Sequence, residues 1–240
     1  MQGEAAHHLG RVLRAQAGQL YELSDGERVW LARVEAAGRE RIEFLLVEEI
    51  PASAPILDTS LLLSIVKFDA FEWALEKATE LGVSRIVPLA AARSERTLVA
   101  AAKKRAERWK KILVEASQQA RRLQMPELEE CRRPEKAFLQ ARGELKLMGS
   151  ERPDAPALHS VLSGKHSKSV SLAIGPEGGW TEQEFAAARQ AGFEEISLGR
   201  LILRAETAVI AALANLNYAM ESGAAQGESE QSLGQNGECE

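Results

Sequence analysis

Apolar residues from position 60 onward alternate between short continuous runs and longer segments with helical spacing. Two of the runs, residues 60–66 and 170–174, are apolar enough to be strands buried on both faces of a parallel sheet. Residues 67–81 instead carry their apolar side chains on one helical side and end at Gly82, a typical helix C-cap. A further apolar run at 85–89 completes a strand–helix–strand unit. The pattern therefore predicts an α/β domain built on a parallel sheet.

The rest of this domain continues the alternation of strands and helices. Thr181-Glu182-Gln183-Glu184 is a capping box, in which the Thr181 hydroxyl and the Glu184 carboxylate each accept from the other residue's main-chain amide. A helix is therefore expected to begin there and to end at Gly192. A basic amphipathic helix is predicted at 100–122, and a final apolar helix at 205–220. Two short strands are predicted at 145–148 and 194–198.

The first fifty residues follow a different pattern, in which apolar and polar residues alternate. Strands separated by polar turns are predicted at 19–23, 29–34 and 41–47. A short helix over residues 7–14 precedes them. Several short strands of this kind favour a small β-barrel.

The two patterns meet at a stiff linker. Pro51–Pro55 contains two prolines separated by small residues, which is typical of an extended connection between domains. We therefore expect one domain over residues 1–54 and a second over residues 55–222. Residues 223–240 are mainly Gly, Gln, Ser and Glu without apolar periodicity, so a disordered acidic tail is expected there.

Glycine-containing loops follow two of the predicted strands. The strand at 170–174 runs into Gly175-Pro176-Glu177-Gly178-Gly179, and the strand at 194–198 runs into Gly199. In open α/β sheets the carboxyl edge of the strands is where ligands bind. Two such loops from one sheet can form a single pocket.

The residues of these loops argue against phosphate and dinucleotide binding. The first loop lacks Gly-Lys-Ser/Thr and carries the carboxylate of Glu177, which would repel phosphate. Its glycines do not follow the G-x-G-x-x-G spacing of a dinucleotide site. A neutral or cationic small ligand held by main-chain groups remains, and S-adenosylmethionine has these properties. A tight turn without a ligand is the alternative for this loop taken alone.

Charge leaves a nucleic-acid partner open. The composition is that of a globular protein, with a net charge of −5. Four glutamates within the last 18 residues account for most of this charge, and local clustering matters more to a polyanion than the total. Basic residues cluster on what are either solvated helix faces or contacts with a polyanion: Lys103, Lys104, Arg105, Arg108, Lys110, Lys111, Arg121, Arg122, Arg132 and Arg133.

No residue pattern indicates a disulfide, a metal site or a membrane segment. Cys131 and Cys239 lack a partner spacing and are interpreted as free thiols. His7 and His8 have no third ligand at a useful spacing, so no metal is expected. Because no apolar run approaches about 20 residues and the N-terminus lacks a signal-peptide layout, a cytoplasmic location is expected.

Motifs along most of the chain resemble those of one family. The loop at 175–179 is followed by Leu198-Gly199 and then by the segment at 202–208, which reads Ile-Leu-Arg-Ala-Glu-Thr-Ala. The upstream matches are His7-His8-Leu9, Lys77-Ala78-Thr79-Glu80-Leu81-Gly82-Val83, Arg93-Ser94, Arg108-Trp109, and Glu115-Ala116 with Gln119, Arg122 and Pro126. In this order, the motifs resemble the ribosomal RNA small subunit methyltransferase E family of the SPOUT superfamily.

The resemblance implies an N-terminal PUA-like β-barrel that binds RNA and a C-terminal α/β domain with a deep trefoil knot. It also implies a homodimer that binds S-adenosyl-L-methionine inside the knot and needs no metal. The residues it places at the cofactor are Gly175, Glu177, Gly178, Gly179, Leu198, Gly199 and Leu203.

The implied reaction is methyl transfer to N3 of one uridine in 16S ribosomal RNA, either free or in the assembled small subunit. We assign Arg204 to stabilising the developing imide anion and Glu206 to positioning or accepting the N3 proton. An Arg204–Glu206 pair that only caps the final helix is the alternative. The residues expected to meet RNA are His8, Arg11, Arg14, Arg93, Gln119 and Arg122.

Two departures from the family pattern bear on these expectations. The family usually has a further strand before the His7-His8 motif, so the barrel is expected to lack its first strand or the start site to differ. The family commonly has Arg where this chain has Leu201, and here Arg200 carries the charge. Two other functions stay open: a SPOUT enzyme acting on a ribose 2′-hydroxyl or on transfer RNA, and a non-catalytic ribosome-assembly factor.

Overall fold

The computed structural model describes residues 1–12, 14–38, 41–51 and 57–234. The chain divides into two compact units, one of Met1–Ala54 with Arg121–Gln124 and one of Pro55–Ala120 with Met125–Glu240. Most of the predicted linker, residues 52–55, lies outside the described residues, as does the end of the predicted tail from residue 235. We describe each unit by itself.

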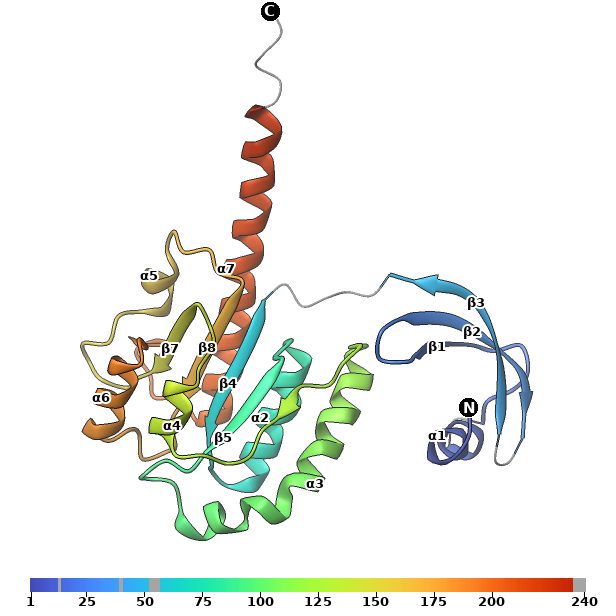
Figure 1. The fold of residues 1–240 in the computed structure, drawn as a ribbon, viewed down its shortest axis with the longest axis horizontal. Coiled ribbons are helices and arrows are strands. Elements are labelled where there is room, and N and C mark those ends of the chain that lie inside the picture. The colour runs from blue at the N-terminus through green and yellow to red at the C-terminus, as the bar shows by residue number, and fades with distance from the viewer. Residues whose placement is uncertain (13, 39–40, 52–56, 235–240) are drawn as a thin grey trace, which may run out of the picture. The chain divides into compact units, whose positions relative to one another are not determined.

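The smaller unit is a three-stranded antiparallel sheet preceded by a short helical segment (Figure 1). The Ser24 to Arg28 turn between the first two strands is held by the Asp25 carboxylate, which accepts from the amides of Arg28 and Glu27 at 2.8 and 2.9 Å. These hydrogen bonds lower the pKa of Asp25. The elements are α1 (Glu4–His7), the π-helix η1 (His8–Val12), β1 (Leu20–Ser24), β2 (Val29–Ala37) and β3 (Ile42–Ile50).

The larger unit is built on six parallel strands in the order β6-β5-β4-β8-β7-β9. The strands are β4 (Asp58–Ser64), β5 (Arg85–Leu89), β6 (Glu127–Leu128), β7 (Leu145–Gly149), β8 (Ser169–Ile174) and β9 (Glu194–Ile196). The helices are α2 (Phe68–Glu80), α3 (Arg96–Gln119), α4 (Pro134–Leu139), α5 (Leu158–Leu162), α6 (Glu182–Gln190) and α7 (Ala205–Gly234). The predicted parallel α/β sheet is therefore confirmed.

Helices cover both faces of this sheet, as Figure 1 shows. On one face, Leu61 and Leu63 of β4 pack in a core with α2, α3 and α7, in which Trp109 lies 4.6 Å from Phe71 between ring centroids. On the other face, Leu62 packs in a second core with α4 and α6. Adjacent strand residues alternate between the two cores because side chains of a strand point to opposite faces.

The structure differs from the sequence patterns in three places. Helices α4 and α5 and the two-residue strand β6 are not predicted by the apolar pattern. Helix α3 starts at Arg96, four residues before the predicted start. Helix α7 continues to Gly234, whereas a disordered tail is predicted from Gly223. The segment contains Ala, Gln and Glu, which have good intrinsic helix propensity, so a helix already formed by the preceding apolar residues can extend into it.

Within the described residues, no helix is long and apolar enough to cross a membrane. No group of three or more His, Cys, Asp or Glu side chains in the described part of the chain is placed to hold a metal ion.

Candidate active site

Three loops meet at the carboxyl edge of the sheet, because β8, β7 and β9 are neighbouring parallel strands. The first loop follows β8 and spans residues 175–180. The second follows β9 and spans residues 197–204. A third, which sequence patterns did not single out, begins with Gly149 and Ser150 at the end of β7. Since β7 lies between the other two strands, its loop occupies the middle of the site.

The first loop is a tight turn held against a buried tryptophan. The Gly179 amide donates to the Pro176 carbonyl at 2.8 Å, and Gly179 has a positive φ of 68°. Trp180 is 5% exposed, and its indole Nε1 donates to the Gly149 carbonyl at 3.0 Å. A Cβ at Gly175 would lie 3.0 Å from two atoms of the Trp180 ring. Packing against this ring therefore favours glycine at position 175.

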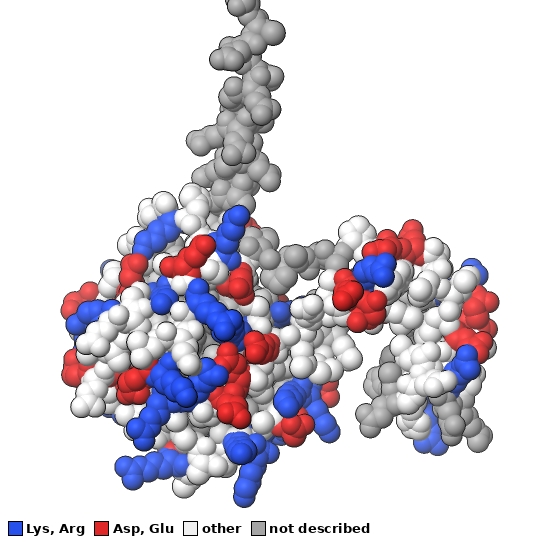
Figure 2. Space-filling view, viewed as in Figure 1, with Lys and Arg blue, Asp and Glu red and all other residues white. Residues whose placement is uncertain are grey.

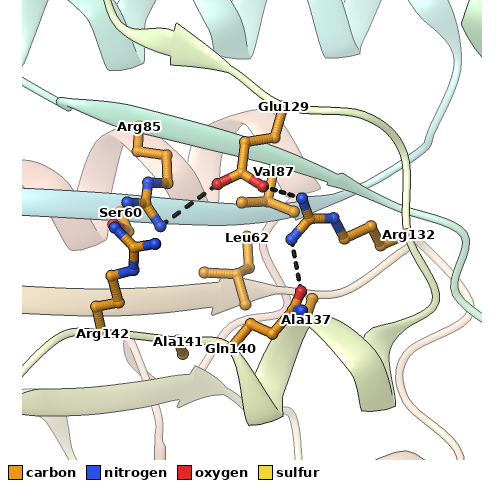
Figure 3. Close-up of a pocket in the computed structure, with 10 residues that line it drawn as sticks. All are labelled: Ser60, Leu62, Arg85, Val87, Glu129, Arg132, Ala137, Gln140, Ala141 and Arg142. Atoms are coloured by element: carbon orange, nitrogen blue, oxygen red, sulfur yellow. Dashed lines mark hydrogen bonds and ion pairs between the residues drawn. The ribbon is translucent and has the colours of Figure 1, made fainter.

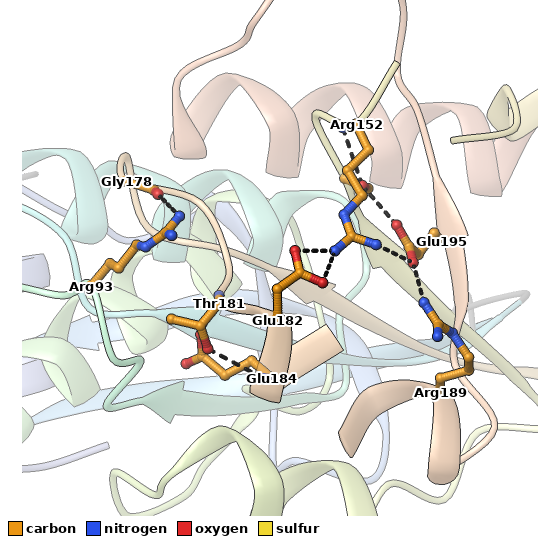
Figure 4. A network of polar contacts seen from close by, with 9 residues as sticks. Arg93, Arg152, Gly178, Thr181, Glu182, Glu184, Arg189 and Glu195 are labelled. Atoms are coloured by element: carbon orange, nitrogen blue, oxygen red, sulfur yellow. Dashed lines mark hydrogen bonds and ion pairs between the residues drawn. The ribbon is translucent and has the colours of Figure 1, made fainter. Parts of the chain in front are cut away.

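Arg93 fixes the tip of the same loop (Figure 4). Its guanidinium donates to the Gly178 carbonyl at 2.8 Å, and a Cβ at Gly178 would lie 3.2 Å from the Arg93 Cβ. Arg93 lies in the loop after β5, so this bond joins loops that are 85 residues apart in the chain. Arg93 is exposed and keeps further N–H groups for a ligand.

The predicted capping box closes the first loop. The Thr181 hydroxyl accepts from the Glu184 amide, and the Glu184 carboxylate accepts from the Thr181 amide at 2.8 Å. Glu184 is 1% exposed, and its other oxygen accepts from the Ala92 amide at 2.9 Å. One buried carboxylate thus ties the start of α6 to the loop after β5.

Replacing Thr181 by Ala should remove this cap and lower the free energy of unfolding by about 1 kcal/mol, the usual effect of losing an N-cap side chain. Urea denaturation of the variant and the wild type measures the difference. Thr181→Ser, which keeps the accepting hydroxyl, is the matched control and should stay close to the wild type. Equal losses for both variants would contradict a capping role.

The second loop offers main-chain groups that the protein itself does not use. The Ser197 hydroxyl donates to the Gly199 carbonyl at 3.0 Å, and Gly199 has a φ of 143°. Leu198 and Leu203 are half-buried. Among the described residues, no hydrogen bond involves the main-chain amide or carbonyl of either leucine. Open donors and acceptors in a partly buried loop suit the edge of an adenine ring.

Arg204 and Glu206 lie at the end of the second loop but do not pair. Glu206, in the first turn of α7, is 9% exposed, and within the described chain its carboxylate has no recorded hydrogen bond or ion pair. Arg204 is exposed, and its main-chain carbonyl accepts from the Ala208 amide at 2.8 Å. The alternative of an ion pair that caps α7 is therefore wrong for the described structure. The Glu206 carboxylate oxygens keep some contact with solvent, since neither is among the fully buried side-chain oxygens without a partner in the described residues.

Ion pairs brace the site from outside (Figure 4). Arg152, beyond β7, donates to both oxygens of Glu182 at the start of α6 and lies 3.5 Å from the Glu195 carboxylate of β9. Hydrogen bonding within the Arg152–Glu182 pair raises the pKa of Arg152 and lowers the pKa of Glu182. Ser150 adds a hydroxyl bond to Glu195 at 3.0 Å. The three strands that carry the loops are thus cross-linked near their carboxyl ends.

The structure does not bring all the predicted RNA residues to these loops. Arg93 lies beside the first loop, but Gln119 ends the 24-residue helix α3 and is therefore about 36 Å along that helix from its start at the site. Arg122 follows three residues later, and burial lowers the pKa of its guanidinium. Arg11 and Arg14 are exposed in the smaller unit. The side chain of His8 lies outside the described part of the chain.

The remaining predicted residues of the loops face solvent. Glu177 and Arg200 are exposed, and Leu201, where the family commonly has Arg, is 82% exposed. Its neighbour Ile202 is 78% exposed.

Comparison with known proteins agrees with this architecture. A family model for an RNA methyltransferase domain matches residues 53–217, and one for an RNA methyltransferase PUA domain matches residues 2–47. Ribosomal RNA small subunit methyltransferase E of Synechocystis is 33% identical over 228 residues, covering 90% of this chain and 71% of that protein. The Bacillus subtilis protein of the same name is 29% identical over 233 residues, covering 91% of this chain and 89% of its own.

Solved structures extend the similarity to the fold. Ribosomal RNA small subunit methyltransferase E from Neisseria gonorrhoeae, solved bound to S-adenosylmethionine, superposes with a TM-score of 0.81 at 33% identity, covering 91% of this chain and 90% of that one. A putative methyltransferase from Legionella pneumophila, also with bound cofactor, gives a TM-score of 0.78 at 29% identity over 90% and 89% of the two chains. The predicted α/β domain with an N-terminal PUA-like domain is confirmed, and the chain belongs to the ribosomal RNA small subunit methyltransferase E family.

Proposed function

We propose that this protein transfers a methyl group from S-adenosylmethionine to N3 of one uridine in 16S ribosomal RNA. The observation that carries the proposal is the second loop, where open main-chain groups at Leu198 and Leu203 are followed by Glu206, whose carboxylate has no partner among the described residues. Membership of the family gives the substrate class, since the relatives are named for methylating small-subunit ribosomal RNA.

The residues present fit the cofactor. Open main-chain donors and acceptors at Leu198 and Leu203 would hold the adenosyl part, and Gly175, Gly178 and Gly179 let the first loop approach closely. Glu177 supplies a carboxylate that a positively charged sulfonium tolerates and a phosphate does not. When bound, S-adenosylmethionine supplies an electrophilic methyl group on sulfur.

The protein's chemical task is to handle the proton on N3. That imide nitrogen is protonated at neutral pH, so its N–H bond must break as the N3–methyl bond forms and the S–methyl bond breaks. Glu206 accepts or positions this proton, because its carboxylate lies at the end of the second loop and has no other partner among the described residues. Arg204 donates to the uracil oxygen on which negative charge develops.

Holding the methyl donor and N3 in line contributes more to the rate of methyl transfer than proton transfer does. A general base typically contributes about 10²–10⁴-fold in rate, whereas holding two reacting groups in line can contribute about 7–11 kcal/mol. The ion pairs of Arg152, Glu182 and Glu195 support alignment because they fasten the loops that would hold the methyl donor.

We further propose that the protein is a homodimer, that its larger unit contains a deep trefoil knot, and that it is located in the cytoplasm. The exposed Leu201, Ile202 and Tyr218 support a dimer, since they form apolar surface on the second loop and on α7. The strand order supports a knot. The chain leaves β8, passes β7 to form β9, and returns through α7, which packs against both β8 and α2. Ribosomal RNA as substrate supports the location.

Titration calorimetry with S-adenosylmethionine, followed by transfer of a labelled methyl group to small ribosomal subunits and to free 16S RNA, tests this proposal. Saturable binding and label on uracil N3 are expected. Absence of cofactor binding would contradict the enzyme assignment and favour a non-catalytic assembly factor. Label on a ribose 2′-hydroxyl or on transfer RNA would replace the proposed substrate with the alternative one.

A further inference from the structure

A groove of about 540 Å³ lies beside the first loop, at the carboxyl end of β5. Its lining includes Arg96 at the start of α3, Arg133 before α4, and the small residues Ala90, Ala91, Ala92 and Ser94. Glu184 also lines the groove, so the residue that caps the helix after the first loop forms part of its wall. The groove therefore adjoins the start of α6, the helix that follows the first loop.

The two arginines of the groove have no protein partner among the described residues. No hydrogen bond or ion pair is recorded for the side chain of Arg96 or Arg133, and both are exposed. Several other arginines of the larger unit, in contrast, are held by carboxylates. Glu72 pairs with Arg105 and Arg108, and Glu195 pairs with Arg152 and Arg189.

Two carboxylates line the groove, and one of them is engaged in hydrogen bonds within the protein. The Glu184 carboxylate is buried and accepts from the Ala92 amide and from the amide and hydroxyl of Thr181. Glu135, on the first turn of α4, is the remaining carboxylate of the lining. Arg93, which lies in the chain between Ala92 and Ser94 of the lining, is also exposed and bonds to the Gly178 carbonyl of the first loop. Figure 2 shows Lys and Arg side chains projecting along the lower rim of the larger unit, which carries the loop between β5 and α3 in Figure 1.

A second basic cluster on this unit, around Glu129, has paired arginines and an adjacent space much smaller than the groove (Figure 3). There Arg85 and Arg132 both pair with Glu129, at 3.4 and 2.5 Å, and Arg132 also donates to Gln140 at 2.6 Å. The adjacent space has room for about one water molecule, with a volume of about 10 Å³. In this cluster Glu129 ties the segment after β6 to the sheet, so Arg85 and Arg132, unlike Arg96 and Arg133, are each paired with a carboxylate.

We infer that the groove binds the sugar-phosphate backbone of the RNA strand next to the target uridine, with Arg96 and Arg133 each contacting a phosphate. The inference rests on the proposed function, since the active site defines which polyanion arrives. The two unpartnered guanidiniums suit the phosphates of an RNA strand, because arginine binds phosphate through two parallel N–H bonds. The small residues of the lining leave space for the strand. Neither arginine touches the cofactor loops, so their role is to position RNA.

The test compares Arg96→Gln, Arg133→Gln and the double variant with Arg142→Gln in binding to fluorescent 16S RNA and to 30S subunits across a salt series. Arg142 is an exposed arginine before β7, at the opposite edge of the sheet, and is the matched control for charge. Each single-strand phosphate contact contributes about 0.7 to the salt slope, so each single variant should lose about fivefold in affinity at 0.1 M salt and the double variant about 25-fold. Calorimetry with S-adenosylmethionine should give the same affinity for all variants.

Three results would overturn the inference. In the first, wild-type protein binds cofactor, binds RNA and methylates it while the groove variants match Arg142→Gln in affinity for RNA and in salt slope. In that case the groove does not bind RNA, and the proposed function stands. If wild-type protein binds neither 16S RNA nor 30S subunits, both proposals fall. If the groove variants keep their affinity for RNA but lose affinity for the cofactor, RNA binding by the groove is likewise contradicted, because the arginines would then act at the cofactor.

Discussion

Glu206→Gln is expected to lower the single-turnover rate of methyl transfer by about 10²–10⁴-fold, the usual contribution of a general base. The amide keeps the size and hydrogen-bonding capacity of the carboxylate but cannot accept the N3 proton. Because Glu206 has no recorded hydrogen bond or ion pair within the described chain, the substitution removes no internal contact, and the folded structure should persist. Rapid-quench measurement with saturating cofactor and substrate gives the rate.

Two further variants separate a loss of catalysis from a general effect of changing a charged residue. Arg204→Ala should also reduce the rate, since it removes the guanidinium that stabilises the imide anion, whereas Glu221→Gln removes an exposed carboxylate farther along α7 and should not. Cofactor affinity, measured in parallel, should be unchanged in all three variants. A transfer rate for Glu206→Gln equal to that of Glu221→Gln would rule out the catalytic assignment.

Gly175→Val should lower the affinity for S-adenosylmethionine at least about tenfold, equivalent to about 1.4 kcal/mol. A Cβ at this position would lie 3.0 Å from the Trp180 ring, which cannot withdraw easily because it is 5% exposed and bonded to the Gly149 carbonyl. Overpacking of this kind typically costs about 1–3 kcal/mol and moves the backbone. The displaced backbone would be the cofactor loop itself.

A second variant identifies the cause of this loss. Replacing Trp180 by Leu in the Gly175→Val background removes the ring against which the new side chain clashes, so part of the lost affinity should return. Calorimetry on both single variants and the double variant completes the cycle. Additive losses would show that the two residues act independently and would contradict the packing argument.

Much of the larger unit follows from apolar spacing alone. The runs at 60–66 and 170–174 form neighbouring central strands, where burial on both faces requires continuous apolar sequence. The capping box at Thr181 places the start of α6 because its two hydrogen bonds are local. Helix α4, with six residues, and β6, with two, are too short to show a period, and their positions depend on contacts with the sheet.

The candidate site is less accessible to sequence reasoning than the fold. Glycine loops after the strands predict its location, and the family motifs single out Arg204 and Glu206. Spacing could not show that Glu206 is buried without a partner, or that Arg93 bonds to Gly178 across 85 residues. Nor could it show that Gln119, on the same amphipathic helix as the basic cluster, ends far from the loops. These facts depend on how distant segments pack.

Nucleoside mass spectrometry of 16S ribosomal RNA from a strain lacking this protein tests the central claim most directly. The account predicts that one 3-methyluridine disappears on deletion, returns when the wild-type gene is supplied, and does not return with the Glu206→Gln variant. An unchanged set of modified nucleosides after deletion, or full restoration by Glu206→Gln, would contradict it.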